Sequence, residues 1–122
     1  MSTSDLLISE IRGVCVVTFG SVSILDAAAV ETIGKRLYAL VDEQARRKLV
    51  LDFSEVRFLT SQMLAVLITL HKKSQAIGGQ VVLCGLRPEL GKVFKVTRLD
   101  KLLSFAGNEE AALASFGVSG KA

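Results

Sequence analysis

The sequence predicts a single α/β domain over residues 1–122 in which about four helices pack against one mixed central β-sheet. Short apolar runs rich in β-branched residues alternate with longer segments whose apolar residues recur every three or four positions, a pattern typical of strands and helices. A strand, a helix and a second strand follow closely over residues 49–86, an order that favours parallel pairing of the two strands. Half of the 122 residues are hydrophobic, enough for one packed core over about residues 5–116.

A β-hairpin is expected to open the domain, with strands over residues 6–8 and Val14–Phe19 joined by a turn at Arg12-Gly13. A long helix follows over residues 26–44, with Asp26 as its N-cap. Its apolar residues have the three-to-four spacing of one helix face: Ala27, Val30, Ile33, Leu37, Leu40 and Val41.

The middle of the chain predicts two buried strands with a helix between them. Residues 49–53 form an almost uninterrupted apolar run, as expected for a strand covered on both faces, and residues 80–86 repeat this pattern. Between them, a broad apolar helical surface begins near Ser61 and ends at Gly78-Gly79. Three elements complete the prediction: a short helix from Pro88, an edge strand over residues 102–105, and a last helix over residues 111–116 behind the N-cap Asn108 and the acidic pair Glu109-Glu110.

Charge and composition argue against nucleic acid binding and membrane insertion. The 15 Lys and Arg against 12 Asp and Glu leave a net charge of +3, and the basic clusters at residues 46–48 and 71–73 are short and separated by apolar segments. The longest apolar run near the middle, residues 63–68, is far shorter than a membrane span, and residues 1–10 contain no basic leader. We therefore expect a cytoplasmic protein that binds no nucleic acid.

Known catalytic and metal-binding patterns are missing from the sequence. Cys15 and Cys84 each lie in an apolar run and are interpreted as small buried hydrophobic residues, which suits a reducing compartment. His71 precedes two lysines and is expected at the border of a helix's polar face rather than as a catalytic base. We therefore predict no enzymatic activity, no bound metal and no cofactor.

Ser61, which follows Thr60 at the expected start of the middle helix, is the leading candidate for a regulatory site. N–H groups in a first helical turn lack partners within the helix and the helix dipole favours negative charge, so a phosphate on Ser61 would be stabilised. Such a phosphate adds about two negative charges to a surface where Leu59 and Met63 could meet a partner, and would weaken an apolar contact. The structural alternative is that Thr60 or Ser61 only caps the helix.

Asp52 allows a second interpretation. A carboxylate at the end of a central parallel strand is where receiver domains carry their phosphoacceptor aspartate. Such a site needs Mg²⁺ held by further carboxylates, which the ends of the first strands do not supply. The simpler hypothesis is an aspartate that accepts hydrogen bonds from loop N–H groups.

Three segments, residues 49–54, 56–61 and 78–84, resemble the STAS domain, and the layout of the whole chain is most similar to that of bacterial anti-sigma factor antagonists. In that family an Asp-Ser-Ser/Thr-Gly-Leu-Gly segment opens the second helix, and an anti-sigma kinase phosphorylates its first serine. Matching position by position places Ser61 on that serine and retains Leu64. The other positions of the motif differ from the family pattern: Thr60, Gln62, Met63 and Ala65.

The resemblance implies a non-enzymatic partner switch. The unphosphorylated domain would bind an ATP-binding anti-sigma factor serine kinase and so release a sigma factor, and phosphorylation at Ser61 would reverse this. Two alternatives stay open: a constitutive STAS subunit of a transporter ATPase complex, with Ser61 as an ordinary cap, and an enzyme that carries a transient phosphate on Ser61 or Asp52. A weak homodimer is also compatible with the sequence. The expected partner-binding surface consists of Leu25, Asp26, Leu59, Thr60, Gln62 and Met63.

Overall fold

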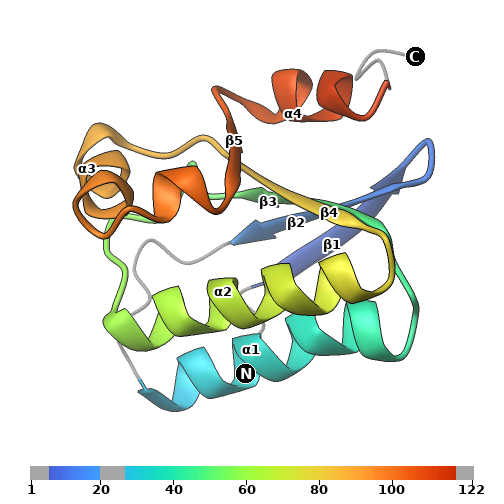
Figure 1. The fold of residues 1–122 in the computed structure, drawn as a ribbon, viewed down its shortest axis with the longest axis horizontal. Helices are drawn as coiled ribbons and strands as arrows, with labels where there is room; N and C mark the ends of the chain where they lie inside the picture. The colour runs from blue at the N-terminus through green and yellow to red at the C-terminus, as the bar shows by residue number, and fades with distance from the viewer. Residues whose placement is uncertain (1–5, 20–26, 118–122) are drawn as a thin grey trace.

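The computed structural model describes residues 6–19 and 27–117. In this part of the chain a five-stranded mixed sheet has the strand order β1-β2-β3-β4-β5 (Figure 1). β1 runs antiparallel to β2, and all other neighbouring strands are parallel. The strands are β1 (Leu6–Ile11), β2 (Val14–Phe19), β3 (Lys48–Asp52), β4 (Gln80–Cys84) and β5 (Ser104–Ala106).

Helices cover both faces of the sheet. α1 (Ala27–Asp42) and α2 (Ser61–Ala76) lie side by side on one face, and α4 (Glu109–Ser115) lies over the other (Figure 1). α3 (Pro88–Val96) and the 3-10 helix η1 (Leu99–Lys101) lie at the end of the sheet where β3 and β4 end. Because α2 also begins at this end, the connections that lead into α2 and α3 are brought close together.

The central strands bury side chains on both faces, which explains their almost uninterrupted apolar sequence. Leu49 and Leu51 belong to the main core beneath α1 and α2, whereas Val50 belongs to a smaller core beneath α4. In the main core the rings of Phe19 and Phe53 pack against each other at a tilt of 38°, with their centroids 4.8 Å apart. The sheet is therefore a layer between two apolar cores.

The predicted hairpin, the first two helices and the parallel β3-α2-β4 unit are confirmed, with shifts at some ends. α1 lies within the predicted range, and its expected N-cap, Asp26, lies outside the described residues. β4 ends at Cys84 rather than at residue 86, because Gly85 has a φ of +72° and turns the chain away from the sheet.

The last part of the chain differs from the prediction at the edge strand. β5 covers Ser104–Ala106 instead of residues 102–105. Arg98 adopts a left-handed φ of 63° and η1 follows, and the N–H groups of Leu102 and Leu103 still bond to the Leu99 carbonyl, so the strand begins only after them. The short helix from Pro88 is confirmed as α3. The final helix is also confirmed, and Asn108 caps it through a 2.8 Å hydrogen bond that its Oδ1 accepts from the Ala111 N–H.

Both cysteines are buried and carry free thiols, as the sequence predicts. His71 is half-buried on α2 and precedes the exposed Lys72, which places it at the border of the polar face. Across residues 6–19 and 27–117, no helix is long and apolar enough to cross a membrane.

Candidate functional site

Thr60, not Ser61, caps the N-terminus of α2. Thr60 is extended, with φ −90° and ψ 161°, and its Oγ1 accepts a 3.0 Å hydrogen bond from the Met63 N–H. Ser61 occupies the first helical position and is exposed, and its hydroxyl has no hydrogen-bond partner among the residues that the structure describes. The Ser61 hydroxyl is therefore accessible for modification without loss of the cap.

The start of α2 favours a negative charge on Ser61. The first turn of this helix contains no acidic residue. The N–H groups of Ser61 and Gln62 are at positions that have no carbonyl partner within a helix, so they and the helix dipole attract an anion. A phosphate on Ser61 would thus be stabilised locally.

The binding surface expected from the sequence is only partly accessible. Leu59 and Thr60 are half-buried, and Gln62 is exposed. Met63 is 0% exposed, because its side chain packs in the main core together with Leu67. The prediction that Met63 contributes to a partner-binding surface is therefore wrong. Two residues of the expected surface lie outside the described residues: Leu25 and Asp26.

Asp52 is held by the loop that follows β3. Its Oδ1 accepts a 2.9 Å hydrogen bond from the Ser54 N–H, which confirms the simpler hypothesis for this residue. Burial, the charge of Asp52 and a hydrogen bond with Asp52 raise the pKa of Glu109 in the first turn of α4. Burial and these two carboxyl groups raise the pKa of Cys84 to about 12, so its thiol stays protonated. In the described ranges, no three His, Cys, Asp or Glu side chains are grouped as metal ligands.

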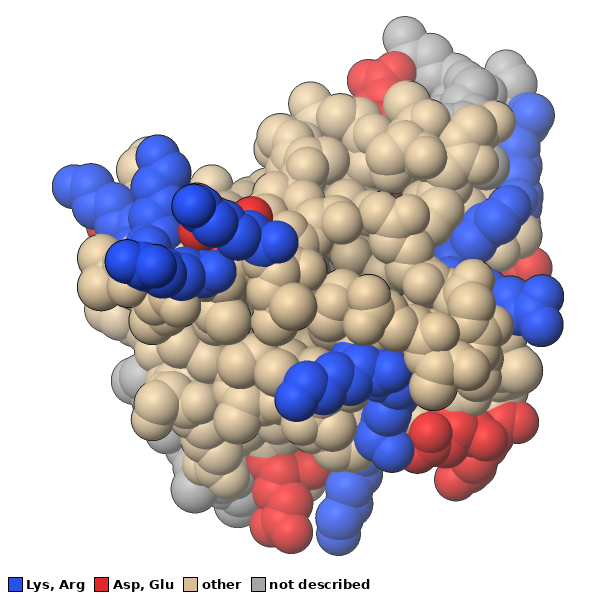
Figure 2. Space-filling view, in the orientation of Figure 1, with Lys and Arg blue, Asp and Glu red and all other residues tan. Residues whose placement is uncertain are grey.

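Basic side chains gather at one corner of the molecule. Figure 2 shows Lys and Arg side chains together at the corner that α3 and η1 form in Figure 1. The exposed cations of these two elements and of the turn between them are Lys92, Lys95, Arg98 and Lys101. Two exposed carboxylates, Glu89 and Asp100, lie on the same elements, so the four cations leave this corner with a net positive charge that favours an anionic surface.

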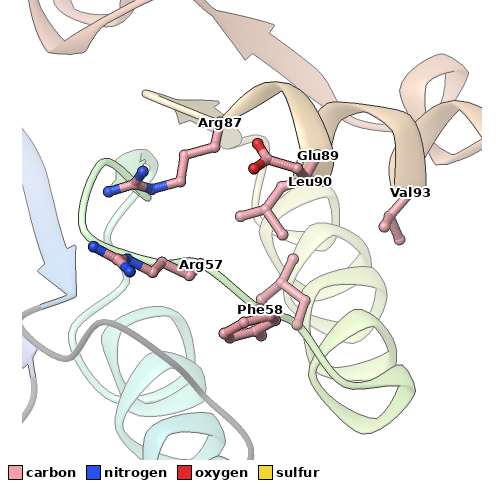
Figure 3. Close-up of a pocket in the computed structure, with 7 residues that line it drawn as sticks. Arg57, Phe58, Arg87, Glu89, Leu90 and Val93 are labelled. Carbon is pink, nitrogen blue, oxygen red and sulfur yellow. The ribbon is translucent and has the colours of Figure 1, made fainter.

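A solvent-open groove of about 570 Å³ lies between the connection that precedes α2 and the start of α3 (Figure 3). Phe58 lines the groove and is 54% exposed, although a phenylalanine side chain is usually buried. Because Leu59 is also a lining residue, the groove adjoins the surface around Ser61. One wall consists of Arg57, Phe58 and Leu59, and the other of Arg87, Glu89, Leu90 and Val93.

The sequence did not predict this groove. Arg57 and Phe58 belong to a segment that resembles the STAS family, but nothing in the local pattern indicates an exposed aromatic ring. Arg87 is distant in sequence and lies on the facing wall because β3 and β4 are adjacent parallel strands that end at the same edge of the sheet. Only a general rule could have indicated a groove here: ligands of open α/β sheets bind outside the carboxyl ends of the parallel strands.

The comparisons with known proteins agree with this fold. A family model for the STAS domain matches residues 6–112. BtrV of Bordetella bronchiseptica, which is provisionally named an anti-sigma factor antagonist, is 31% identical over 93 residues, which are 76% of this chain and 79% of that protein.

Solved structures give the same result. An anti-sigma factor antagonist from Mycobacterium paratuberculosis is 26% identical with a TM-score of 0.79, and the match covers 94% of this chain and 97% of that one. An anti-sigma factor antagonist (STAS) domain protein from Planctomyces limnophilus is 24% identical with a TM-score of 0.84, and the match covers 93% and 99% of the two chains. The family model and the identity to BtrV show that this chain belongs to the STAS domain family.

Proposed function

We propose that this chain is an anti-sigma factor antagonist, a non-enzymatic regulator that binds an anti-sigma factor serine kinase and releases it when Ser61 is phosphorylated. The observation that carries the proposal is the position of Ser61, which is exposed and first in α2 while Thr60 supplies the cap. The names of BtrV and of the Mycobacterium protein support this class of function. SpoIIAA, an anti-sigma factor antagonist with the same fold, is known in an unphosphorylated and a phosphorylated form.

A phosphate on Ser61 would act on the contact surface itself. It adds about two negative charges near Leu59 and Phe58, which both expose apolar surface. A partner that covers these side chains would have to remove the phosphate from water, and burying an unpaired charge is unfavourable. Because the N-terminus of α2 stabilises the phosphate, the domain stays folded while the partner is released.

The kinase would bring the ATP, so the antagonist itself requires no cofactor. The alternative, a constitutive STAS subunit of a transporter ATPase complex, is less favoured because the named relatives are anti-sigma factor antagonists. The two functions differ in one measurable property: only the antagonist binds its partner in a way that depends on Ser61.

Phosphorylation of the purified domain tests the proposal. Wild type and Ser61→Asp are first used to capture proteins from a lysate of the source organism, and an ATP-binding serine kinase captured by wild type alone is then purified. With radiolabelled ATP and this kinase, we expect label on wild type and on Ser54→Ala, a control that removes another exposed hydroxyl, but not on Ser61→Ala. Labelling of Ser61→Ala at the wild-type level would overturn the assignment. Equal capture of a transporter ATPase by wild type and Ser61→Asp would support the alternative function.

A further inference from the structure

The groove between the α2 and α3 connections has an apolar end. Phe58 is 54% exposed on one wall, and the half-buried Val93 and the buried Leu90 line the other. Val96, one helical turn after Val93 on the same face of α3, is 83% exposed. An apolar strip therefore leads from the groove along α3, where another molecule could bury an apolar side chain.

The other end of the groove is basic. Figure 3 shows the side chains of Arg57 and Arg87 extending from the two connections in the same direction, away from Val93. Within residues 6–19 and 27–117 neither arginine has an ion-pair partner, and the Nε of Arg87 is buried without a hydrogen-bond acceptor. A buried donor without an acceptor costs free energy, and so do two like charges on facing walls, unless an anion binds there.

The size and charge of the groove indicate a ligand larger than a single ion. A volume of about 570 Å³ is in the usual range of ligand pockets and is large enough for several amino-acid side chains. Among the lining residues that the structure describes, Glu89 is the only carboxylate, and the exposed Lys92 and Lys95 follow it on α3. This positive potential beside an apolar strip complements an acidic segment that carries an apolar residue.

We infer that the groove binds an acidic segment of a protein partner, with an apolar side chain against Phe58 and Val93 and a carboxylate held by Arg57 and Arg87. The inference rests on the proposed function for the identity of the partner: the anti-sigma factor kinase would present this segment beside Ser61. A phosphate on Ser61 would then repel the acidic segment in addition to disturbing the apolar contact. Binding of an acidic peptide to the groove does not itself depend on that function.

Nuclear magnetic resonance titration of the ¹⁵N-labelled full chain with the peptide acetyl-Glu-Leu-Glu-Phe-Glu-amide tests the inference. We expect the amide signals of residues that line the groove to move. Arg87→Gln should weaken binding about tenfold and Arg57→Gln about threefold, because Arg87 is the more buried of the two. Glu89→Gln should strengthen binding about twofold, because it removes a charge of the same sign as the peptide. Lys48→Gln is the matched control, since Lys48 is exposed at the opposite end of β3 and should leave the affinity unchanged.

Several results would overturn the inference. One is that no groove signal moves. Another is that the lysine counterpart, acetyl-Lys-Leu-Lys-Phe-Lys-amide, binds with the same affinity. A third is that inorganic phosphate alone moves the same signals with equal affinity, which would make the groove an anion site rather than a peptide site.

The Ser61→Asp variant distinguishes failure of this inference from failure of the proposed function. If the acidic peptide binds wild type and Ser61→Asp equally well, the groove is a peptide site but it is not coupled to Ser61. If the kinase phosphorylates Ser61 and no acidic peptide binds, the proposed function holds and the inference about the groove is wrong.

Discussion

Replacing Thr60 and Ser61 by alanine one at a time separates the cap of α2 from the proposed phosphorylation site. Thr60→Ala removes the acceptor of the 3.0 Å hydrogen bond from the partly buried Met63 N–H. Loss of such a cap costs about 1–2 kcal/mol of unfolding free energy, and the buried position of Met63 limits replacement of the bond by water. Ser61→Ala removes a hydroxyl without a partner in the described part of the chain, so we expect a change below about 0.5 kcal/mol.

Urea unfolding followed by circular dichroism measures these free energies, and thermal unfolding provides a second measurement. For a chain of this length, about 1 kcal/mol corresponds to roughly 4 °C in Tm, so Thr60→Ala should lower the Tm by about 4–8 °C. Thr60→Ser keeps a hydroxyl at the cap and is the matched control. If Ser61→Ala destabilised the chain as much as Thr60→Ala, Ser61 would be a structural residue and the separation of the two roles would be refuted.

Three further predictions concern the surroundings of Asp52. Gly85→Ala should lower the unfolding free energy by about 1–3 kcal/mol, because Gly85 has a φ of +72° and an added Cβ would lie 2.9 Å from the Asp52 Oδ1. Gly107→Ala, with open space around its Cβ, is the control, and an equal cost for both would contradict the prediction. Since folding raises the pKa of Glu109, its stabilising contribution is complete below the unfolded value of about 4.3 and is lost as pH rises through the folded value. Wild type should therefore lose more stability than Glu109→Gln between about pH 4 and pH 7, whereas identical pH profiles in urea unfolding would exclude this. Finally, a buried Cys84 thiol with a pKa of about 12 should not react with Ellman's reagent in the folded chain, and rapid labelling before unfolding would show that it is accessible.

The sequence predicts the long elements well, because each one buries a face that its apolar spacing reveals. This holds for α1 and for the β3-α2-β4 unit. The edge strand was misplaced because it depends on one backbone conformation. Arg98 adopts a left-handed φ of 63°, which is uncommon for a residue other than glycine or asparagine, so no residue pattern marks the turn that moves β5 to Ser104–Ala106.

The candidate site could be predicted only in part. The position of Ser61 could be predicted from the sequence. A buried strand followed by two hydroxyl residues and then by an apolar helical pattern marks a helix N-terminus. The burial of Met63 also had a signal, since Met63 shares the helical spacing of Leu67. Its closeness to Ser61 in the sequence nevertheless suggested a place on the contact surface. The groove had no local signal in the sequence. Arg57 and Arg87 are distant in sequence and line one groove because β3 and β4 are neighbours in the sheet.

Isothermal titration calorimetry of the proposed kinase partner with wild type and with Ser61→Asp tests most directly whether Ser61 controls partner binding. An aspartate at the first position of α2 should keep or slightly raise the stability of the domain. The same negative charge should weaken binding of the kinase at least about tenfold. Equal Kd values for two folded variants would contradict the proposal that phosphorylation of Ser61 releases the partner.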